Sequence, residues 1–455
     1  MIIDSALRRR EFLRSLFTIA LPVATQNLLS SSVNLVDNLM VGQLGDVAIA
    51  GLGIANQVFF LMLFLIFGIN NGGAILVSQF WGKKDLVNVH RVLGICLILG
   101  IAAASVFTVL TLVFPRWVIG LFSVDPAVIS LGADYLQVVG LSYIATAISF
   151  SFAILLRSVE KATPPMVISL VTIGLNCLGN YALIFGEFGF PKLGVVGSAI
   201  ATCYARYAEC LLLVGLVYSR KYPLAAKLRK MLEIPRALAL RYIQRAVPVI
   251  FQEFSWALGI TLYQVIYARI GTAAVAAVNI VSTFERFLFV VFVGLGSSAG
   301  VMIGKSIGQD RENQAHWLGR QYCTLGVAAA LVIGALIIIL RNWVLGFYQI
   351  SAEVHDLAAG MFLVLGFILW MKAGNMLLIS GIFRSGGDTK FAFLLDTAGV
   401  WLVGLPLGML AAFFGHFDPV LVYLVIGAEE LVKLAIAAYR FNSRKWINNL
   451  VVDLP

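Results

Sequence analysis

The stretch VAIAGLGIANQVFFLMLFLIFGINNGGAILVSQFWG, residues 47–82, contains no Asp, Glu, Lys or Arg. A transmembrane helix needs about 20 mostly apolar residues to cross the hydrocarbon of a bilayer, so this stretch is long enough to span one. Further charge-free stretches of similar character lie at 92–115, 135–156, 162–186, 321–340 and 397–417. The sequence therefore predicts an all-α integral membrane protein.

The composition excludes several other classes of protein. Of the 455 residues, 60% are hydrophobic and 12% are charged, whereas a soluble domain carries about 25% charged residues. In such a chain the net charge of +10 indicates membrane topology rather than nucleic-acid binding. The five Cys form no CxxC motif and the four His are scattered, so we expect no disulfide, structural zinc or other cofactor.

Apolar length and the Gly and Pro breaks predict twelve transmembrane helices. The N-terminal apolar run follows a cluster of arginines, but it is long and polar-studded, so we expect a retained first span rather than a cleaved signal peptide. The predicted spans lie near 16–40, 52–80, 90–115, 127–156, 165–186, 194–219, 247–270, 273–305, 316–347, 357–384, 390–415 and 419–440.

The distribution of Lys and Arg predicts the orientation. With the N-terminus and the even-numbered loops on one side, that side holds 25 basic residues and the opposite side holds four. Cytoplasmic loops carry the excess of Lys and Arg. We therefore expect a multi-pass protein of the plasma (inner) membrane with both termini in the cytoplasm.

The two halves of the chain resemble each other. A shift of 226 residues overlays 20–85 on 246–311 without a gap and matches Pro22 with Pro248, Gln26 with Gln252 and Gly68 with Gly294. We predict an N-lobe at 1–219, a basic cytoplasmic linker at 220–245 and a C-lobe at 246–455. Six helices return each lobe to the same side, so the lobes are expected to be related by a pseudo-two-fold axis along the membrane normal, an arrangement typical of secondary transporters.

Several motifs together resemble the multidrug and toxic compound extrusion (MATE) family. They are ALPV at 20–23, VDNLMVG at 36–42, GxxAxA at 45–50, PPM at 164–166, Asn176, NY at 180–181, GVVGSAIAT at 194–202 and FRSGGDTK at 383–390. The resemblance implies a V-shaped pair of six-helix bundles that exports organic cations or other drugs in exchange for Na⁺ or H⁺.

Polar residues in the first, fifth and sixth spans predict a cation-coupling site in the N-lobe. Asp37 is the charged residue of the first span, and a carboxylate in the membrane is costly and usually functional. Asn176 and Asn180 are four residues apart and share a helix face. The family resemblance assigns Asp37, Asn176, Asn180 and Thr202 to this cluster, with Na⁺ as a candidate ion at the first three. Asp37 is alternatively a structural, hydrogen-bonded acid.

A second group of polar residues predicts the C-lobe cavity. Glu253 matches an acid that the resemblance links to cation coupling, while Lys372 stands near the place of that branch's partner acid. Lys372 is a candidate ion-pair partner of Glu253 or Asp396, either as a static salt bridge or as part of coupling. The expected cavity set is Gln252, Glu253, Tyr263, Lys372, Asn375 and Asp396.

Other functions are less well supported by the residues. A flippase for lipid-linked precursors is the main alternative, but it calls for several basic cavity residues, and only Arg206, Arg286 and Lys372 qualify. A membrane enzyme such as a prenyltransferase would need paired Asp-rich motifs, and a directly ATP-driven protein would need a P-loop; the sequence contains neither. We therefore expect a monomeric transporter of small molecules, surrounded by lipid and without nucleic-acid partners, and no enzyme activity.

Overall fold

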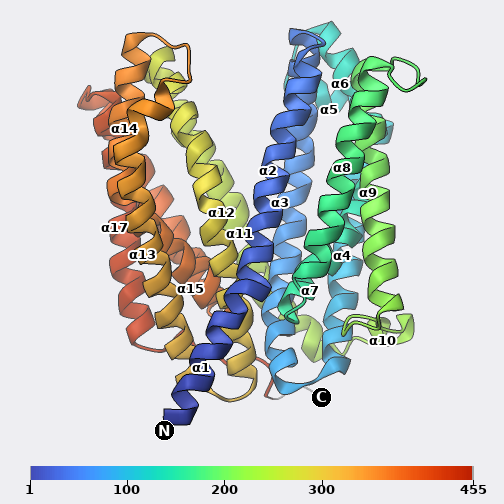
Figure 1. Ribbon diagram of the computed structural model, residues 1–455, viewed down its shortest axis with the longest axis vertical. Coiled ribbons are helices and arrows are strands. Elements are labelled where there is room, and N and C mark those ends of the chain that lie inside the picture. The colour runs from blue at the N-terminus through green and yellow to red at the C-terminus, as the bar shows by residue number, and fades with distance from the viewer. Residues whose placement is uncertain (1, 453–455) are drawn as a thin grey trace. The chain divides into compact units, whose positions relative to one another are not determined.

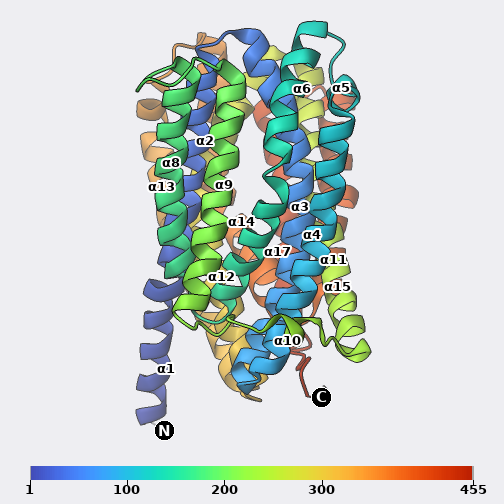
Figure 2. The same ribbon diagram turned by 90° about the vertical axis from the view of Figure 1, so that its right-hand side faces the viewer.

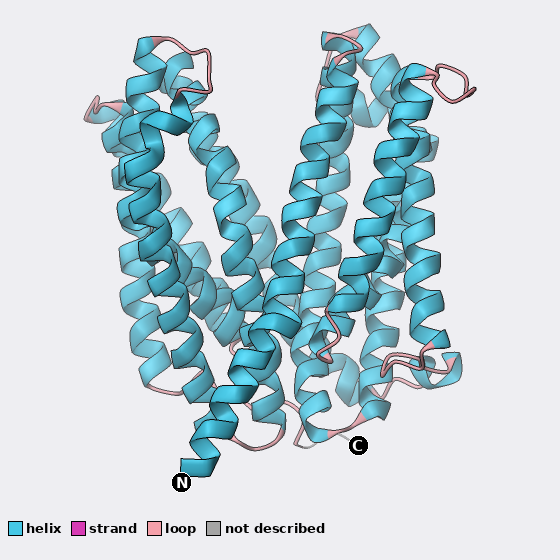
Figure 3. Ribbon diagram, in the orientation of Figure 1, coloured by secondary structure: helices cyan, strands magenta, loops and turns pink. Residues whose placement is uncertain are grey.

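A computed structural model describes residues 2–452, apart from the side chains of residues 2–8 and 33–39. Within that range the protein consists of helices joined by loops and turns, with no strand (Figure 3). The helices of the first half are α1 (Ile2–Ser15), η1 (Leu16–Ala20), α2 (Leu21–Gly42), α3 (Asp46–Lys83), α4 (Leu86–Val113), α5 (Pro115–Gly120), α6 (Pro126–Gly140), α7 (Tyr143–Ser158), α8 (Thr163–Phe185), α9 (Gly194–Ser219) and α10 (Leu228–Leu232). Those of the second half are α11 (Arg236–Ile270), α12 (Thr272–Gly308), α13 (Glu312–Leu345), α14 (Ala352–Asn375), η2 (Met376–Phe383), α15 (Thr389–Ala398), η3 (Gly399–Gly404), α16 (Leu405–Met409), η4 (Leu410–Phe414) and α17 (Pro419–Asn442).

The predicted fold class is confirmed. Ten helices in the described part of the chain are long and apolar enough to cross a membrane, and the bent pair α6 and α7 raises the number to eleven. α17 is a further helix of 24 residues, set apart by its three mid-helix charges. The first and seventh predicted spans are shorter than the helices that contain them, because charge marks the membrane boundary and not the helix end.

The bend between α6 and α7 measures 51° and follows Gly140. Carbonyl groups freed by a helix break must find other partners inside a membrane. Thr108 donates its hydroxyl to the Gly140 carbonyl oxygen (3.1 Å), and Tyr207 donates to the Leu141 carbonyl oxygen (2.9 Å). Side chains of α4 and α9 therefore compensate the backbone at this break.

The helices repeat at the offset predicted from the sequence. α3 and α12 begin 226 residues apart, and the same offset separates the starts of α4 and α13, of α6 and α14, and of α8 and α15. The repeat is not identical in geometry, since α8 is one regular helix while its counterpart, residues 389–414, contains the wider π turns η3 and η4. The repeat of the sequence is thus also a repeat of structure.

The described chain divides into two compact units. Unit 1 contains residues 2–24 and 251–452, and unit 2 contains residues 25–250. In unit 2, α8 and α9 run side by side in both views (Figures 1 and 2). The chain passes from unit 1 to unit 2 within its first long helix, and back to unit 1 within α11, at positions that again differ by 226. Each unit therefore includes the first part of the helix that opens the other repeat. The predicted lobe and linker boundaries at 219/220 and 245/246 stay a prediction.

Glycines allow these exchanged helix segments to pack closely. A Cβ atom at Gly294 of α12 would overlap the Ala20 carbonyl oxygen, and one at Gly68 of α3 would lie 2.7 Å from the Ile250 Cα atom. Small residues let helix backbones approach one another in membrane proteins. The matched glycines of the repeat are therefore explained by the same contact made once in each unit.

Tyrosine hydroxyl groups hold the same two segments. In unit 1 the Tyr322 hydroxyl lies 2.7 Å from the hydroxyl oxygens of Ser15 and Ser298. In unit 2 the Tyr242 hydroxyl donates to the Ile69 carbonyl oxygen (2.7 Å). Tyr322 belongs to the receiving unit's α13, whereas Tyr242 belongs to the exchanged part of α11.

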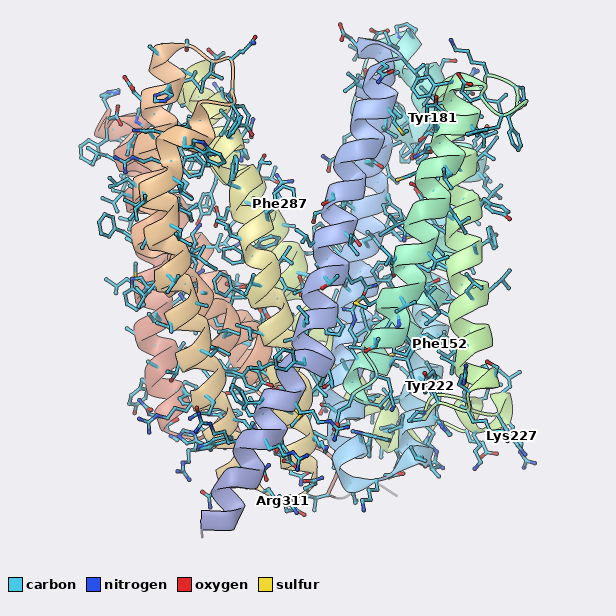
Figure 4. All side chains as sticks on the ribbon, viewed as in Figure 1. Phe152, Tyr181, Tyr222, Lys227, Phe287 and Arg311 are labelled. Atoms are coloured by element: carbon cyan, nitrogen blue, oxygen red, sulfur yellow. The ribbon has the colours of Figure 1, made fainter. Side chains whose placement is uncertain are left out.

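One end of unit 1 gathers both ends of the described chain. Gln314 donates to Glu11 of α1 (3.3 Å), and Asn449 donates to Asp310 (2.7 Å). Arg311, in the turn between α12 and α13, lies at this end (Figure 4). The start of α1 and the last described residues are thus on the same side of unit 1, as an even number of spans requires.

Candidate functional site

Two asparagines of α8 and a threonine of α9 form a hydrogen-bonded row in unit 2. The Asn180 amide donates to Asn176 Oδ1, and the Asn176 amide donates to Thr202 Oγ1, each over 3.3 Å. Both asparagines are buried, and the predicted common face is confirmed. Asp37 belongs to α2, but its side chain lies outside the described residues. The role of these four residues in cation coupling therefore stays a prediction.

Gln26 of α2 connects three further helices of unit 2. Arg157 of α7 donates to Gln26 Oε1 (2.6 Å), and Gln26 Nε2 donates to the Ser169 hydroxyl of α8 (2.7 Å). Ser169 donates in turn to Glu209 of α9 (2.9 Å), whose other oxygen pairs with Arg206 (3.0 Å). The predicted local pairing of Arg206 with Glu209 is confirmed. The result is a continuous polar chain in which the acid has its own base.

The same arginine–glutamine pair occurs in unit 1. Arg384 Nε donates to Gln252 Oε1 (3.0 Å), and its Nη1 pairs with Glu253 Oε1 (2.7 Å). Gln252 Nε2 donates to Asp396 Oδ2 of α15 (2.9 Å). We call the two pairs the Arg–Gln nodes, namely Arg157 with Gln26 in unit 2 and Arg384 with Gln252 in unit 1. They connect three of the predicted C-lobe residues, Gln252, Glu253 and Asp396.

A group of charged residues surrounds α17, and we call it the α17 cluster: Asp396, Glu429, Glu430 and Lys433. The Lys433 ammonium lies 3.3 Å from Glu430, 3.4 Å from Glu429 and 3.6 Å from Asp396. Glu429, Glu430 and Lys433 are each more than nine-tenths buried. The expectation that these α17 charges neutralise one another locally is incomplete, because one lysine faces three carboxylates and one of them comes from α15.

Neutral donors from two other helices complete this cluster. The Tyr263 hydroxyl of α11 donates to Glu429 Oε2 (2.7 Å), and the Asn375 amide of α14 donates to Glu430 Oε2 and to the Glu430 carbonyl oxygen, both over 2.7 Å. Two more predicted C-lobe residues therefore contact the α17 cluster directly.

The predicted partners of Lys372 were wrong. Lys372 pairs with Glu285 of α12 over 2.5 Å, while Glu253 pairs with Arg384 and Asp396 approaches Lys433. The Tyr423 hydroxyl adds a longer bond to the second Glu285 oxygen (3.5 Å). Lys372 precedes Asn375 by one helical turn on α14, but the two side chains meet different helices.

Two glycines of η3 make room for the α17 charges. A Cβ atom at Gly399 would lie 2.6 Å from Lys433 Cγ, and one at Gly404 would overlap the Tyr263 hydroxyl and Glu429 Oε2. Wider π turns such as η3 often occur at functional sites. The irregular backbone of residues 389–414 is therefore adapted to buried charges that α8, its counterpart, does not have to accommodate.

Sequence reasoning missed four residues of the unit 1 network as site residues: Glu285, Arg384, Glu429 and Lys433. A signal was available for Arg384, because the repeat matches Leu156-Arg157-Ser158 with Phe383-Arg384-Ser385 and Gln26 with Gln252. No spacing within one helix indicates the Lys372–Glu285 pair, which joins residues 87 positions apart.

Comparison with known proteins identifies the family. The segments 22–182 and 248–410 each match the MatE family model, and they begin 226 residues apart. This chain belongs to the MatE family. The two matches correspond to the two structural repeats, so the MatE unit occurs twice in one polypeptide.

Relatives of this MatE protein extend over nearly its whole length. It is 27% identical over 448 residues to the uncharacterized transporter YisQ of Bacillus subtilis, with 95% of each chain covered. It is 25% identical over 425 residues to the probable multidrug resistance protein NorM of Bacillus anthracis, with 90% of this chain and 92% of the relative covered. A crystal structure of the MATE transporter VcmN of Vibrio cholerae superimposes with a TM-score of 0.88 at 19% identity, over 98% of this chain and 99% of that one. The fold of this MatE protein is therefore that of a MATE transporter.

Metal-binding geometry was examined for the acids, histidines and cysteines. Among the side chains that the structure describes, no group of three or more of these residues is arranged to hold a metal ion. That statement does not reach the predicted Na⁺ site, because Asp37 lies outside it.

Proposed function

We propose that this protein exports organic cations or amphiphilic drugs across the cell membrane in exchange for Na⁺ or H⁺, by alternating access of its two lobes. The observation that carries the proposal is a buried polar network in each unit of a protein whose helices are otherwise apolar. Polar and ionisable groups in a membrane are costly and mark substrate or ion pathways. Family membership supports transport, and the NorM relative, named a probable multidrug resistance protein, supports drugs as the cargo.

In the proposed cycle Asp37 exchanges one cation for another. Asp37 ionises when the site opens outward and takes up Na⁺ or H⁺, which weakens its hold on the organic cation. The π turn η1 ends just before Pro22, and proline permits a helix to bend because it removes a backbone hydrogen bond. Exchange of one monovalent cation for another is electroneutral, so the membrane potential of about 2.3 kcal/mol per charge per 100 mV does no net work. The chemical gradient of the incoming ion then drives export.

The proposal includes a location and an assembly state. The 25-to-4 distribution of basic residues favours an inner (plasma) membrane protein with cytoplasmic termini. The coincidence of both chain ends on one side of unit 1 agrees with that orientation. We propose that the protein acts as a monomer in contact with membrane lipids.

The paired bases count against the flippase alternative. Arg206 is ion-paired with Glu209, and Lys372 with Glu285, so two of the three basic residues on which a phosphate-binding cavity would depend already have acidic partners. Only Arg286, which is exposed, keeps the character that this alternative needs.

The test is dye efflux from proteoliposomes under separately imposed Na⁺ and H⁺ gradients. We expect efflux with one of the gradients and its loss in Asp37→Asn, with the variant still inserted in the membrane. Asp46→Asn is the matched control, because Asp46 is an exposed residue at the start of α3 and should leave efflux unchanged. Wild-type efflux by Asp37→Asn would remove this residue from the mechanism, and a lack of dye transport under either gradient would contradict the function.

A further inference from the structure

The charged groups of unit 1 do not balance. Its buried network contains five carboxylates and three cations: Glu253, Glu285, Asp396, Glu429 and Glu430 against Lys372, Arg384 and Lys433. Arg384 pairs with Glu253 and Lys372 with Glu285, which leaves Lys433 alone with three acids. Full ionisation would therefore leave two negative charges in excess within the α17 cluster.

The elements packed around α17 supply little to offset this excess. α14 contributes the Asn375 amide and α11 contributes the Tyr263 hydroxyl, both neutral donors. Lys372 of α14 acts on Glu430 over a distance but has Glu285 as its partner. A buried charge without a counter-charge is neutralised in preference to remaining ionised, because its desolvation costs many kcal/mol. Something that carries positive charge must therefore join this cluster.

Asparagine 375 gives a second, independent indication. It is 3% exposed, its amide nitrogen donates to Glu430, and its Oδ1 atom has no hydrogen-bond partner among the described residues. A buried acceptor without a donor is costly. The cluster thus lacks a donor at the same place where it has too much negative charge. A hydrogen atom on a neighbouring carboxyl group corrects the excess of charge and supplies a donor.

A proton fits this place better than a metal ion. No group of three or more acids in the described part of the chain has metal-ligand geometry, and Na⁺ would need a shell of oxygen ligands, whereas a proton needs one oxygen. Lys433 also occupies the position between the three carboxylates.

We propose that the α17 cluster is a proton-binding site, in which one proton is shared by Asp396, Glu429 and Glu430 beside Lys433. Because the three carboxyl groups interact, the proton belongs to the group and not to one residue. This site lies in unit 1, whereas Asp37 and its asparagine row belong to the other repeat. The inference therefore goes beyond the proposed function and does not depend on drug export.

Infrared spectroscopy of the purified full-length protein in lipid nanodiscs tests the proposal without a drug or a gradient. The Asp37→Asn background removes any contribution of that carboxyl group. We expect a carbonyl stretch of a neutral carboxylic acid at neutral pH that shifts when H₂O is exchanged for D₂O. Glu429→Gln or Glu430→Gln should abolish the band, because one acid fewer lets the remaining acids stay ionised.

Glu209→Gln is the matched control, since Glu209 is a buried acid with its own base, Arg206, and its replacement should leave the band unchanged. Lys433→Met should increase the band roughly twofold, because removal of the ammonium raises the excess of acids by one. A wild-type spectrum without this band overturns the proposal, as does a band that keeps its full intensity in Glu429→Gln, Glu430→Gln and Asp396→Asn. An unchanged band in a folded Lys433→Met variant overturns the charge argument. Asp37-dependent efflux that persists alongside any of these results would leave the proposed function standing.

Discussion

The two Arg–Gln nodes show what the repeat preserves and what it changes. In each unit an arginine near the end of one helix holds the glutamine that lies two residues past the point where the chain enters that unit. Beyond the glutamine the units differ. Gln26 contacts the neutral Ser169 and through it Glu209, whereas Gln252 contacts the acid Asp396, which approaches Lys433.

This difference indicates that backbone geometry and charge have diverged separately. The helix starts, the close glycines and the Arg–Gln pairs keep one register, so they serve the packing that both units need. The charged residues around them do not repeat, and unit 1 alone joins three carboxylates to one lysine. The two units are therefore similar as scaffolds and different as ion-binding media.

Removal of the arginines should show the largest difference between the nodes. Arg384→Met leaves Glu253 without its ion-pair partner, and breaking a partly buried pair in this way costs about 3–5 kcal/mol of unfolding free energy. Arg157→Met leaves only the neutral Gln26 oxygen without this donor, which costs about 1–3 kcal/mol. Chemical denaturation in detergent measures both values.

The double variant Arg384→Met with Glu253→Gln controls for the leftover charge. It should recover a large part of the loss, because it removes the uncompensated carboxylate. Equal losses for Arg157→Met and Arg384→Met, or no recovery in the double variant, would mean that the nodes differ in packing and not in charge.

The irregular helix of unit 1 provides the second test. Gly404→Ala places a methyl group against the Tyr263 hydroxyl and Glu429, and overpacking of this kind costs about 1–3 kcal/mol. Gly174 of α8, in the counterpart helix, has open space around its missing Cβ. Gly174→Ala should therefore be neutral or slightly stabilising, by up to about 1 kcal/mol, since alanine favours the helix. A destabilised Gly174→Ala with a tolerated Gly404→Ala would reverse this assignment of the crowded helix.

Much of the fold was predictable because membrane helices are set by local composition. The charge-free run 47–82 lies within α3, and the shift of 226 fixed the starts of four further helices in the second half from those in the first. Helix ends were less predictable: α11 begins at Arg236 although the apolar span begins later. Charge density follows the membrane surface, while the helix continues into the polar region.

The site was predictable only where partners share a helix. The spacing of Asn176 and Asn180 gave their common face, and that of Arg206 and Glu209 gave their ion pair. Lys372 was assigned the wrong partner because the choice among several intramembrane acids depends on how α12 and α14 are rotated about their axes. A single sequence contains no direct information on that rotation.

The exchanged helix segments provide the smallest expected effect and the test of what the units share. Tyr242→Phe removes one hydroxyl group from the Ile69 carbonyl oxygen, which as a helix interior group has a backbone donor as well. Tyr322→Phe removes the hydroxyl between Ser15 and Ser298, but Ser15 still donates to the Phe12 carbonyl oxygen, and Ser298 to that of Ser15. Neither change strands a buried group, so each should cost about 0.5–1.5 kcal/mol of unfolding free energy. The two values should agree within error in the same denaturation assay. If one variant unfolds while the other is neutral, the exchange stabilises only one of the units, and the scaffold is then as asymmetric as the charges.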